Sequence, residues 1–287
     1  MSAPGHRRAA VLGSPIAHSL SPVLHRTAYA ALGLAEWTYE RYEVDESGIG
    51  DFLRDFGAEW AGLSLTMPLK RVVIPHLDEV TPTAAAVEAV NTVIRTPDGR
   101  RVGDNTDIHG MVAALHERGV DRVPRAAVLG AGATAASALA ALSRVCAGEV
   151  TAYVRGEARA EEMRGWGERL GVDVRTAPWA DAAEALRAPL VVATTPAGAT
   201  DGLAVAGALP AEPGTLFDVV YEPWPTPLAA AWARAGGTVV GGLDLLVHQA
   251  VLQVEQMTGR APAPLAAMRH AGEDALAARS GAPPPPG

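Results

Sequence analysis

The stretch VLGAGATAAS, residues 128–137, decides the expected fold. It matches the pattern G-x-G-x-x-A at Gly130, Gly132 and Ala135, directly after an apolar run and at the start of an alanine-rich helical run. Such a turn lets the backbone approach a pyrophosphate closely, while N–H groups at the helix start face the phosphate oxygens. The sequence therefore predicts that a dinucleotide-binding βαβ unit begins near residue 125.

The end of the next expected strand, residues 149–155, bears on which dinucleotide would bind. An acidic residue there suits the ribose 2′-hydroxyl of NAD, whereas a cation suits the 2′-phosphate of NADP. The strand ends in Arg155, and Arg159 follows one helical turn later. Because a guanidinium donates in a planar fork to phosphate, the pair favours NADP. Two alternatives stay open: both arginines could pair with Glu157 or Glu161, and Glu157 could compete for the ribose.

Outward from this unit, β-rich runs alternate with Ala- and Leu-rich helical runs, which predicts α/β architecture with mostly parallel sheets. Strands are expected at residues 8–13, 37–44, 60–66, 125–130, 149–155, 172–176, 189–195, 215–221 and 237–242. Helices are expected after the glycine turn and at residues 22–33, 49–56, 68–77, 82–89, 108–119, 158–171, 243–259 and 264–278. A hairpin over residues 91–103 should turn at Pro97-Asp98-Gly99.

A fresh βαβ unit so far along the chain predicts two domains. We expect a substrate-binding catalytic domain over residues 1–107 plus 243–280, with the last helices packing back on it. A Rossmann-type NADP-binding domain should span residues 108–242, with the reaction in the cleft between the domains. The proline-rich end, residues 281–287, is expected to be a disordered tail.

Composition excludes several functional classes. The 287 residues are 48% hydrophobic and 20% charged, as in ordinary globular proteins. A net charge of −8 without a basic stripe argues against nucleic acid as a partner. No apolar run is long enough for a membrane span, and the N-terminus does not resemble a secretory signal. Cys146 is the single cysteine, which excludes an internal disulfide. We therefore expect a cytoplasmic protein.

Lys70 is the only lysine among 24 Lys and Arg residues. A desolvated lysine can lose its proton near neutral pH, whereas arginine stays charged, so a group that exchanges a proton must be the lysine. Asp104 and Asp107 of GDNTD could hold and orient its ammonium group. The alternative of a calcium loop fails because the EF-hand spacing is absent. Thr106 or Asp107 could instead cap the following helix.

Six motifs in a fixed order identify a family resemblance over roughly residues 8 to 270. They are SPIAHSLSPVLH at 14–25, G-x-S-x-T-M-P-x-K at 62–70, AVNT at 89–92, GDNTD at 103–107, GAGATA at 130–135 and GGLDLLVHQA at 241–250. In this order they resemble the shikimate dehydrogenases. The resemblance implies reversible, NADP-dependent reduction of 3-dehydroshikimate to shikimate, on the route to chorismate and aromatic amino acids. It also implies a dimer; we expect a homodimer, with a monomer as the alternative, and we expect no metal site.

The resemblance assigns roles by position. Lys70 and Asp107 match the catalytic pair. The positions that match substrate-binding residues are Ser19, Ser21, Thr66, Asn91, Asp107, Tyr221 and Gln249. Those expected to bind the cofactor are Gly130, Gly132, Ala133, Ala135, Arg155, Arg159, Gly242 and Leu245. Without the resemblance, Ser21 before Pro22 could be a helix cap, and Tyr221 a core aromatic.

The chain also departs from the family pattern. Ser64 stands where the family often has asparagine. The usual Asn-Arg-Thr at the 2′-phosphate reads Val154-Arg155-Gly156, which weakens the expected NADP preference. Asp244 adds a charge where the family commonly has glycine, in a segment expected near the nicotinamide.

Three other functions stay open. A quinate or dual quinate/shikimate dehydrogenase would share the fold, and pocket room near Ser19 and Thr66 would distinguish it. A methylene-folate dehydrogenase also pairs a lysine-bearing domain with a nucleotide domain, but the HSLSP and DNTD motifs speak against it. A non-catalytic NADP-responsive regulator would have no need of a proton donor such as Lys70.

Overall fold

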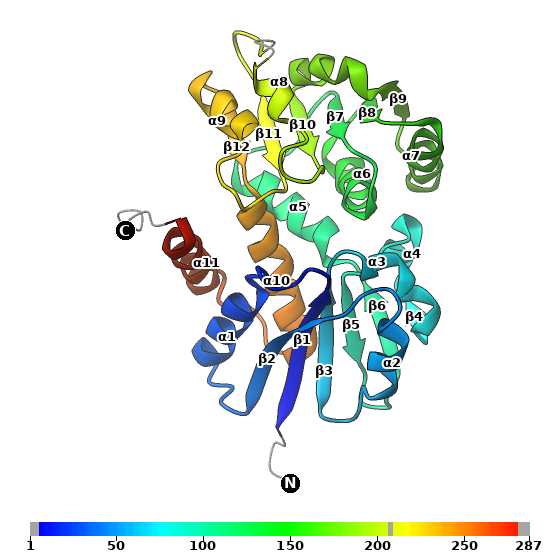
Figure 1. Cartoon of the computed structure of the whole chain (residues 1–287), viewed down its shortest axis with the longest axis vertical. Helices are drawn as coiled ribbons and strands as arrows, with labels where there is room; N and C mark the ends of the chain where they lie inside the picture. Colours follow the sequence, from blue (N-terminus) through cyan, green and yellow to red (C-terminus); the bar gives the residue numbers. More distant parts are fainter. Residues whose placement is uncertain (1–5, 206–208, 281–287) are drawn as a thin grey trace. The chain divides into compact units, whose positions relative to one another are not determined.

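The structure, a computed structural model, describes residues 6–205 and 209–280. The chain divides into two compact units (Figure 1). The first comprises Met1–Thr106 with Leu246–Gly287, and the second comprises Asp107–Leu245. Each unit contains one six-stranded sheet with helices, as the alternating pattern predicted. The predicted tail at residues 281–287 lies outside the described residues. The assignment of substrate to one unit and NADP to the other stays a prediction.

The first unit is built on a mixed sheet with strand order β2-β1-β3-β5-β6-β4. Its strands are β1 Arg7–Gly13, β2 Trp37–Glu43, β3 Trp60–Leu65, β4 Glu79–Val80, β5 Thr92–Arg95 and β6 Arg101–Asp104. β1 pairs in parallel with β2 and β3, whereas β5 is antiparallel to β3 and β6. The predicted hairpin is the β5–β6 pair, and Gly99 in its turn has φ +90°. The parallel strands β1 and β3 bring their carboxyl ends to one edge of the sheet, and the motif at 14–25 follows the first of these ends while the motif at 62–70 spans the second.

Helices surround this sheet. They are α1 Ser21–Ala31, α2 Ile49–Arg54, α3 Leu69–Val72, the 3₁₀ turn η1 Ile74–His76, α4 Pro82–Val87, α10 Gly242–Thr258 and α11 Leu265–Ser280. α11 packs beside α1, so the C-terminal helices return to the first unit as predicted (Figure 1). Ser21 is not the N-cap of α1: Leu20 holds that position without a side-chain hydrogen bond, and Ser21 is buried. The capping alternative for Ser21 is therefore wrong.

The second unit contains an all-parallel sheet with strand order β12-β11-β10-β7-β8-β9. Its strands are β7 Ala126–Leu129, β8 Val150–Val154, β9 Val174–Pro178, β10 Leu190–Ala193, β11 Thr215–Asp218 and β12 Thr238–Val240. The helical elements are α5 Thr106–Glu117, α6 Ala133–Val145, α7 Glu157–Leu170, the 3₁₀ helix η2 Trp179–Arg187, α8 Asp201–Val205 and α9 Pro227–Arg234. This is the doubly wound dinucleotide-binding order, which reverses between β7 and β10.

Four elements were not predicted: β4, η2, α8 and α9. β4 has two residues and α8 has five, too few to show a period. α9 begins after Thr226, whose hydroxyl accepts from Ala229 N at 3.1 Å, with Pro227 in its first turn. That Thr-Pro start is a recognisable helix signal, although no helix was expected there.

Candidate active site

The loop after β1 is held against the loop after β3. A Cβ at Gly13 would lie 2.4 Å from Thr66 Cγ2, so only glycine permits this approach. Ser14 N donates to the carbonyl oxygen of Met67 at 3.0 Å, and Thr66 N donates to Leu12 O at 3.0 Å. The start of the motif that carries Ser19 and Ser21 therefore lies against the loop that carries Thr66.

Lys70 is placed next to the start of β5. It lies on the four-residue helix α3, which follows β3 directly. Val90 N donates to the carbonyl oxygen of Lys70 at 2.8 Å, and Leu65 N donates to Asn91 O at 2.7 Å. Two of the predicted motifs, 62–70 and 89–92, are thus brought together by main-chain hydrogen bonds.

Asn91, Thr106 and Gln249 form a buried polar cluster within the first unit. Thr106 N donates to Asn91 Oδ1 at 2.8 Å, so the asparagine side chain caps the start of α5. Asn91 Nδ2 donates to Thr106 Oγ1 at 3.0 Å and to Gln249 Oε1 at 3.4 Å. Thr106 was expected only as a possible cap, yet it joins two of the predicted substrate residues.

The structure distinguishes the two aspartates that could have partnered Lys70. Asp104 accepts from Thr81 Oγ1 and from Gln256 Nε2, each at 2.7 Å, so both of its oxygens hold other elements together. Asp107 is buried in the first turn of α5, directly after the capped Thr106. The hydrogen bonds of Asp104 thus give it a structural role, and the catalytic role of Asp107 stays a prediction.

Ser64 belongs to a buried chain of hydrogen bonds. Tyr39 donates to Ser64 Oγ at 2.6 Å, and Ser64 donates to Gln253 Oε1 at 2.7 Å. Ser21 hydrogen-bonds the Tyr39 hydroxyl at the other end. Tyr39 and Gln253 were missed from the sequence. Gln253 follows Gln249 by one helical turn, which puts both amides on one face of α10 and could have indicated a shared role.

His25 is a buried, neutral member of this region. Its ring stacks on Tyr39 at 3.9 Å between centroids, and Nε2 lies 3.3 Å from Gln253 Oε1. Desolvation by burial lowers the pKa of His25 from 6.5 to about 3, although the hydrogen bond with Gln253 opposes the shift. The ring therefore stays uncharged in the folded protein at neutral pH.

This burial predicts an acid-dependent loss of stability. Between pH about 3 and 6.5 the unfolded chain binds a proton at His25 and the folded chain does not, so stability rises with pH across that window and is level above it. The contribution is about 1.4 kcal/mol per pH unit, or about 2 kcal/mol lost between pH 7 and pH 5. His25→Phe, which keeps a ring beside Tyr39, should lose less stability over that interval by urea unfolding. Equal losses in both proteins would contradict the assignment.

In the second unit the glycine loop leaves room for a ligand. Gly130 has φ +110°, and a Cβ there would lie 2.8 Å from Thr194 Oγ1. Nothing lies within 4 Å of a Cβ placed at Gly132, and α6 begins at Ala133. Ala135 is fully buried in that first turn, so a small residue is required for packing. The loop therefore fits a dinucleotide pyrophosphate at the switch point between β7 and β10.

Arg155 is held by an aromatic platform. Its guanidinium lies over the Trp179 ring, 5.3 Å from the centroid, and Trp179 packs against the core of this unit. Arg159 pairs with Glu162 at 2.6 Å, whereas Glu157 pairs with Arg164 at 2.5 Å. The alternatives that paired the arginines with Glu157 or Glu161 are thus replaced by different contacts.

The start of α10 packs closely on the end of β11. A Cβ at Gly242 would lie 2.2 Å from Val219 O, which explains the glycine, and Leu245 is buried one turn later. Asp244 accepts from Gly241 N at 3.1 Å and pairs with Arg118 at 3.3 Å. The added charge of Asp244 is therefore compensated by a helix start and a cation. Tyr221 is the third residue after the end of β11 and is half-buried.

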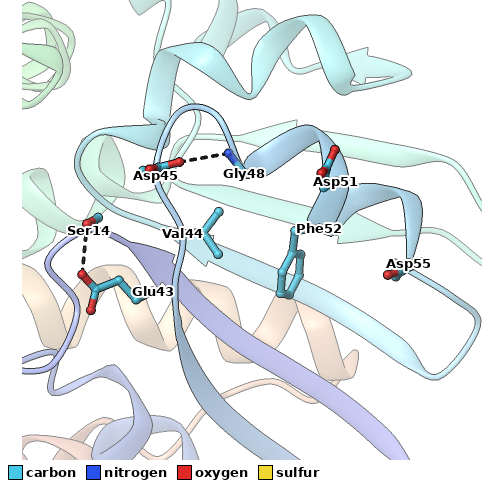
Figure 2. Close-up of a pocket in the computed structure, with 8 residues that line it drawn as sticks. All are labelled: Ser14, Glu43, Val44, Asp45, Gly48, Asp51, Phe52 and Asp55. Atoms are coloured by element: carbon cyan, nitrogen blue, oxygen red, sulfur yellow. Dashed lines mark hydrogen bonds between the residues drawn. The ribbon is translucent and has the colours of Figure 1, made fainter.

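An acidic pocket in the first unit is a poor candidate for the substrate site. Figure 2 shows it between the end of β2 and α2, where Glu43, Asp45, Asp51 and Asp55 contribute four carboxylates to its lining. Glu43 accepts from Ser14 at 3.2 Å, and Asp45 accepts from Gly48 N at 3.0 Å. A surface of this charge repels a carboxylate or a phosphate.

Two kinds of feature are absent from the described residues. Within residues 6–205 and 209–280, no group of three or more His, Cys, Asp and Glu side chains could hold a metal ion. Over the same residues, no helix is long and apolar enough to cross a membrane.

Comparisons with known proteins give a consistent result. The family "Shikimate dehydrogenase substrate binding domain" matches residues 11–93, and "Shikimate 5'-dehydrogenase C-terminal domain" matches residues 242–271. A curated shikimate dehydrogenase (NADP(+)) of Thermus thermophilus is 38% identical over 262 residues, 90% of this chain and 94% of that protein.

Solved structures agree. Shikimate dehydrogenase of Mycobacterium tuberculosis has a TM-score of 0.83 and 43% identity, over 95% of this chain and 99% of that one. A Thermus thermophilus shikimate 5-dehydrogenase, in complex with NADP(H) and shikimate, has a TM-score of 0.81 and 32% identity, over 94% and 100%. A doubly wound parallel sheet with a glycine loop at its switch point is the fold of nucleotide-dependent dehydrogenases. Within that class, the chain belongs to the shikimate dehydrogenase family.

Proposed function

We propose that this protein is an NADP-dependent shikimate dehydrogenase, which reversibly reduces 3-dehydroshikimate to shikimate on the route to chorismate and aromatic amino acids. One observation carries the proposal: Asn91, Thr106 and Gln249 form a buried cluster of amides and a hydroxyl beside the loop of Lys70. Curated relatives named for this activity support it.

The proposed substrate residues suit a small polyhydroxylated acid. Such a molecule needs hydroxyl and amide partners, since each buried ring hydroxyl must be hydrogen-bonded. The residues proposed to bind it are Ser19, Ser21, Thr66, Asn91, Asp107, Tyr221 and Gln249. The loop contacts of Gly13 and Thr66, and the Asn91 cluster, support a common site for the members of this set that lie in the first unit.

The proposed chemistry needs one proton donor. NADPH supplies a hydride to the ketone carbon when it is bound. Lys70 donates a proton to the oxygen that becomes the alcohol and stabilises the negative charge developing there. Asp107 orients the ammonium group of Lys70. In the oxidative direction the same amine accepts the proton.

The proposed cofactor residues occupy two places in the second unit. Gly130, Gly132, Ala133 and Ala135 hold the pyrophosphate at the start of α6, and Gly242 and Leu245 lie on the nicotinamide side. Arg155 binds the 2′-phosphate. The Arg155 guanidinium carbon lies 5.3 Å from the centroid of the Trp179 ring, and a cation–π contact of this kind does not use up the N–H donors that a phosphate needs. Arg159 contributes less, since it is paired with Glu162.

The test is a steady-state assay of NADP⁺ reduction with shikimate and quinate side by side. We expect kcat/KM for shikimate to exceed that for quinate by at least about tenfold, since an extra ring hydroxyl would have to be accommodated in a site of matched polar groups. Comparable rates would favour the dual quinate/shikimate alternative. No turnover with either acid, despite binding of NADP⁺, would favour the non-catalytic regulator and contradict the proposal.

The setting of the enzyme is also part of the proposal. We infer a cytoplasmic location and a homodimer, with a monomer as the alternative. The absence of a described membrane-spanning helix and the single cysteine are compatible with that location. Light scattering after size-exclusion chromatography distinguishes the two oligomeric states.

A further inference from the structure

Gln253 uses every hydrogen-bonding position of its side chain. It lies on α10 and is 1% exposed. Its amide nitrogen lies 3.2 Å from the main-chain oxygen of Asn91 and 2.9 Å from Thr92 Oγ1. Its amide oxygen lies 2.7 Å from Ser64 Oγ and 3.3 Å from His25 Nε2. Two donors and two acceptor positions are all occupied.

Chemistry fixes which way this amide points. A main-chain carbonyl oxygen can only accept, so the atom that faces Asn91 O must be the amide nitrogen of Gln253. The amide oxygen must then face Ser64 and His25, and both of these groups must donate to it. The orientation therefore follows from the partners and not from an arbitrary choice between O and N.

One branch of hydrogen bonds runs from Gln253 to the proposed substrate cluster. Thr92 Oγ1 accepts from Gln253, which leaves its single proton for Asn91 Oδ1 at 2.8 Å. Asn91 is thus held at two atoms, directly at its main-chain oxygen and through Thr92 at its side-chain oxygen. With Oδ1 fixed, the Asn91 amino group faces Thr106 and Gln249.

A second branch runs from Gln253 to Ser21, another proposed substrate-binding residue. Ser64 donates to Gln253 and accepts from Tyr39, whose hydroxyl is hydrogen-bonded to Ser21. Both branches lie within the first unit. One side chain on α10 therefore links residues on α1, β2, β3 and β5.

We propose that Gln253 is a positioning residue for the substrate site. Together with Thr106 N and Leu65 N, which donate to the same two oxygens of Asn91, it fixes the orientation of Asn91 and thereby the direction of the Asn91 donors, without touching the substrate itself. This inference rests on the proposed substrate-binding role of Asn91. Gln253 should consequently affect substrate binding far more than the chemical step or cofactor binding.

The experiment compares variants by steady-state kinetics and thermal unfolding. Gln253→Met keeps the length of the side chain and removes all four hydrogen bonds. Thr92→Val removes the link from Gln253 to the Asn91 side chain, together with a 3.3 Å contact between the Thr92 and Thr106 hydroxyls. Each should raise KM for shikimate by about tenfold, with kcat changed less than about threefold and KM for NADP⁺ unchanged. If Gln253→Met does not fold, the KM of Thr92→Val for shikimate tests the proposal by itself.

Gln256→Met is the matched control. Gln256 lies on the same helix, and its amide is bonded to Asp104, outside both branches. KM for shikimate should stay within about twofold of the parent value in this variant. A rise equal to that of Gln253→Met would show a general effect of disturbing α10 and would overturn the proposal.

A double-mutant cycle with Asn91→Ala separates the two levels of inference. Asn91→Ala alone should raise KM for shikimate, and adding Gln253→Met should then raise it less than about twofold further. The full tenfold effect in the Asn91→Ala background, or an unchanged KM in folded Gln253→Met, would overturn the role of Gln253 only. An unchanged KM in Asn91→Ala would overturn the proposed substrate site instead.

Discussion

Replacing Lys70 with methionine is expected to lower kcat for shikimate oxidation by about 10²- to 10⁴-fold, the usual contribution of a general acid–base group. Methionine preserves much of the length and packing of lysine but cannot exchange a proton. KM for NADP⁺ should change little, since Lys70 lies on α3 of the first unit and the glycine loop belongs to the second. Steady-state kinetics in both directions measure the effect.

Lys70→Arg distinguishes charge from proton transfer. Arginine keeps a positive charge but does not deprotonate in proteins, so this variant should be nearly as impaired as Lys70→Met. Arg54→Met is the control: it removes a cation from an exposed pair with Asp51 and should leave kcat within about twofold. Near-normal turnover in Lys70→Met would exclude Lys70 as the proton donor.

The sequence specified much of the fold because the relevant signals are local. The glycine turn at residues 130–135 is defined by adjacent residues, and the strand-helix alternation of both units is legible from apolar periodicity. The hairpin turn at Pro97-Asp98-Gly99 needs a glycine at positive φ, which the sequence supplies. Two-residue strands and short helices such as β4 and α8 lack enough residues for any period, so they were missed.

The candidate site was less predictable because its contacts join distant residues. Asp104 and Asp107 look equivalent in GDNTD, and only the bonds of Asp104 with Thr81 and Gln256 separate them. Gln253 is an ordinary helical glutamine until α10 packs over β3 and β5. Ser64, which departs from the family pattern, is explained by its position between Tyr39 and Gln253.

The arginine at the end of β8 leads to the second large prediction. Arg155→Leu should lower the ratio of kcat/KM for NADP⁺ to that for NAD⁺ by about 10²-fold. A hydrogen bond to a charged group contributes about 1.5–3 kcal/mol, and each 1.4 kcal/mol corresponds to tenfold. Most of the loss should fall on NADP⁺, since NAD⁺ has no 2′-phosphate to lose. Titration with 2′,5′-ADP and with ADP measures the same discrimination without turnover.

Three further variants locate the source of this preference. Trp179→Leu leaves Arg155 in place but removes its platform, so the ratio should fall by about tenfold, less than in Arg155→Leu. Arg159→Leu should have a smaller effect than either, because the Arg159 guanidinium is engaged by Glu162. Arg175→Leu, which breaks an exposed pair with Glu149, is the control for loss of a cation from this unit.

If Arg155→Leu and Arg175→Leu gave the same ratio of kcat/KM for NADP⁺ to that for NAD⁺, the 2′-phosphate would have to be bound elsewhere. A larger fall of this ratio in Arg159→Leu than in Arg155→Leu would assign the 2′-phosphate to Arg159. In that case Arg159 would have to leave Glu162 when the cofactor binds.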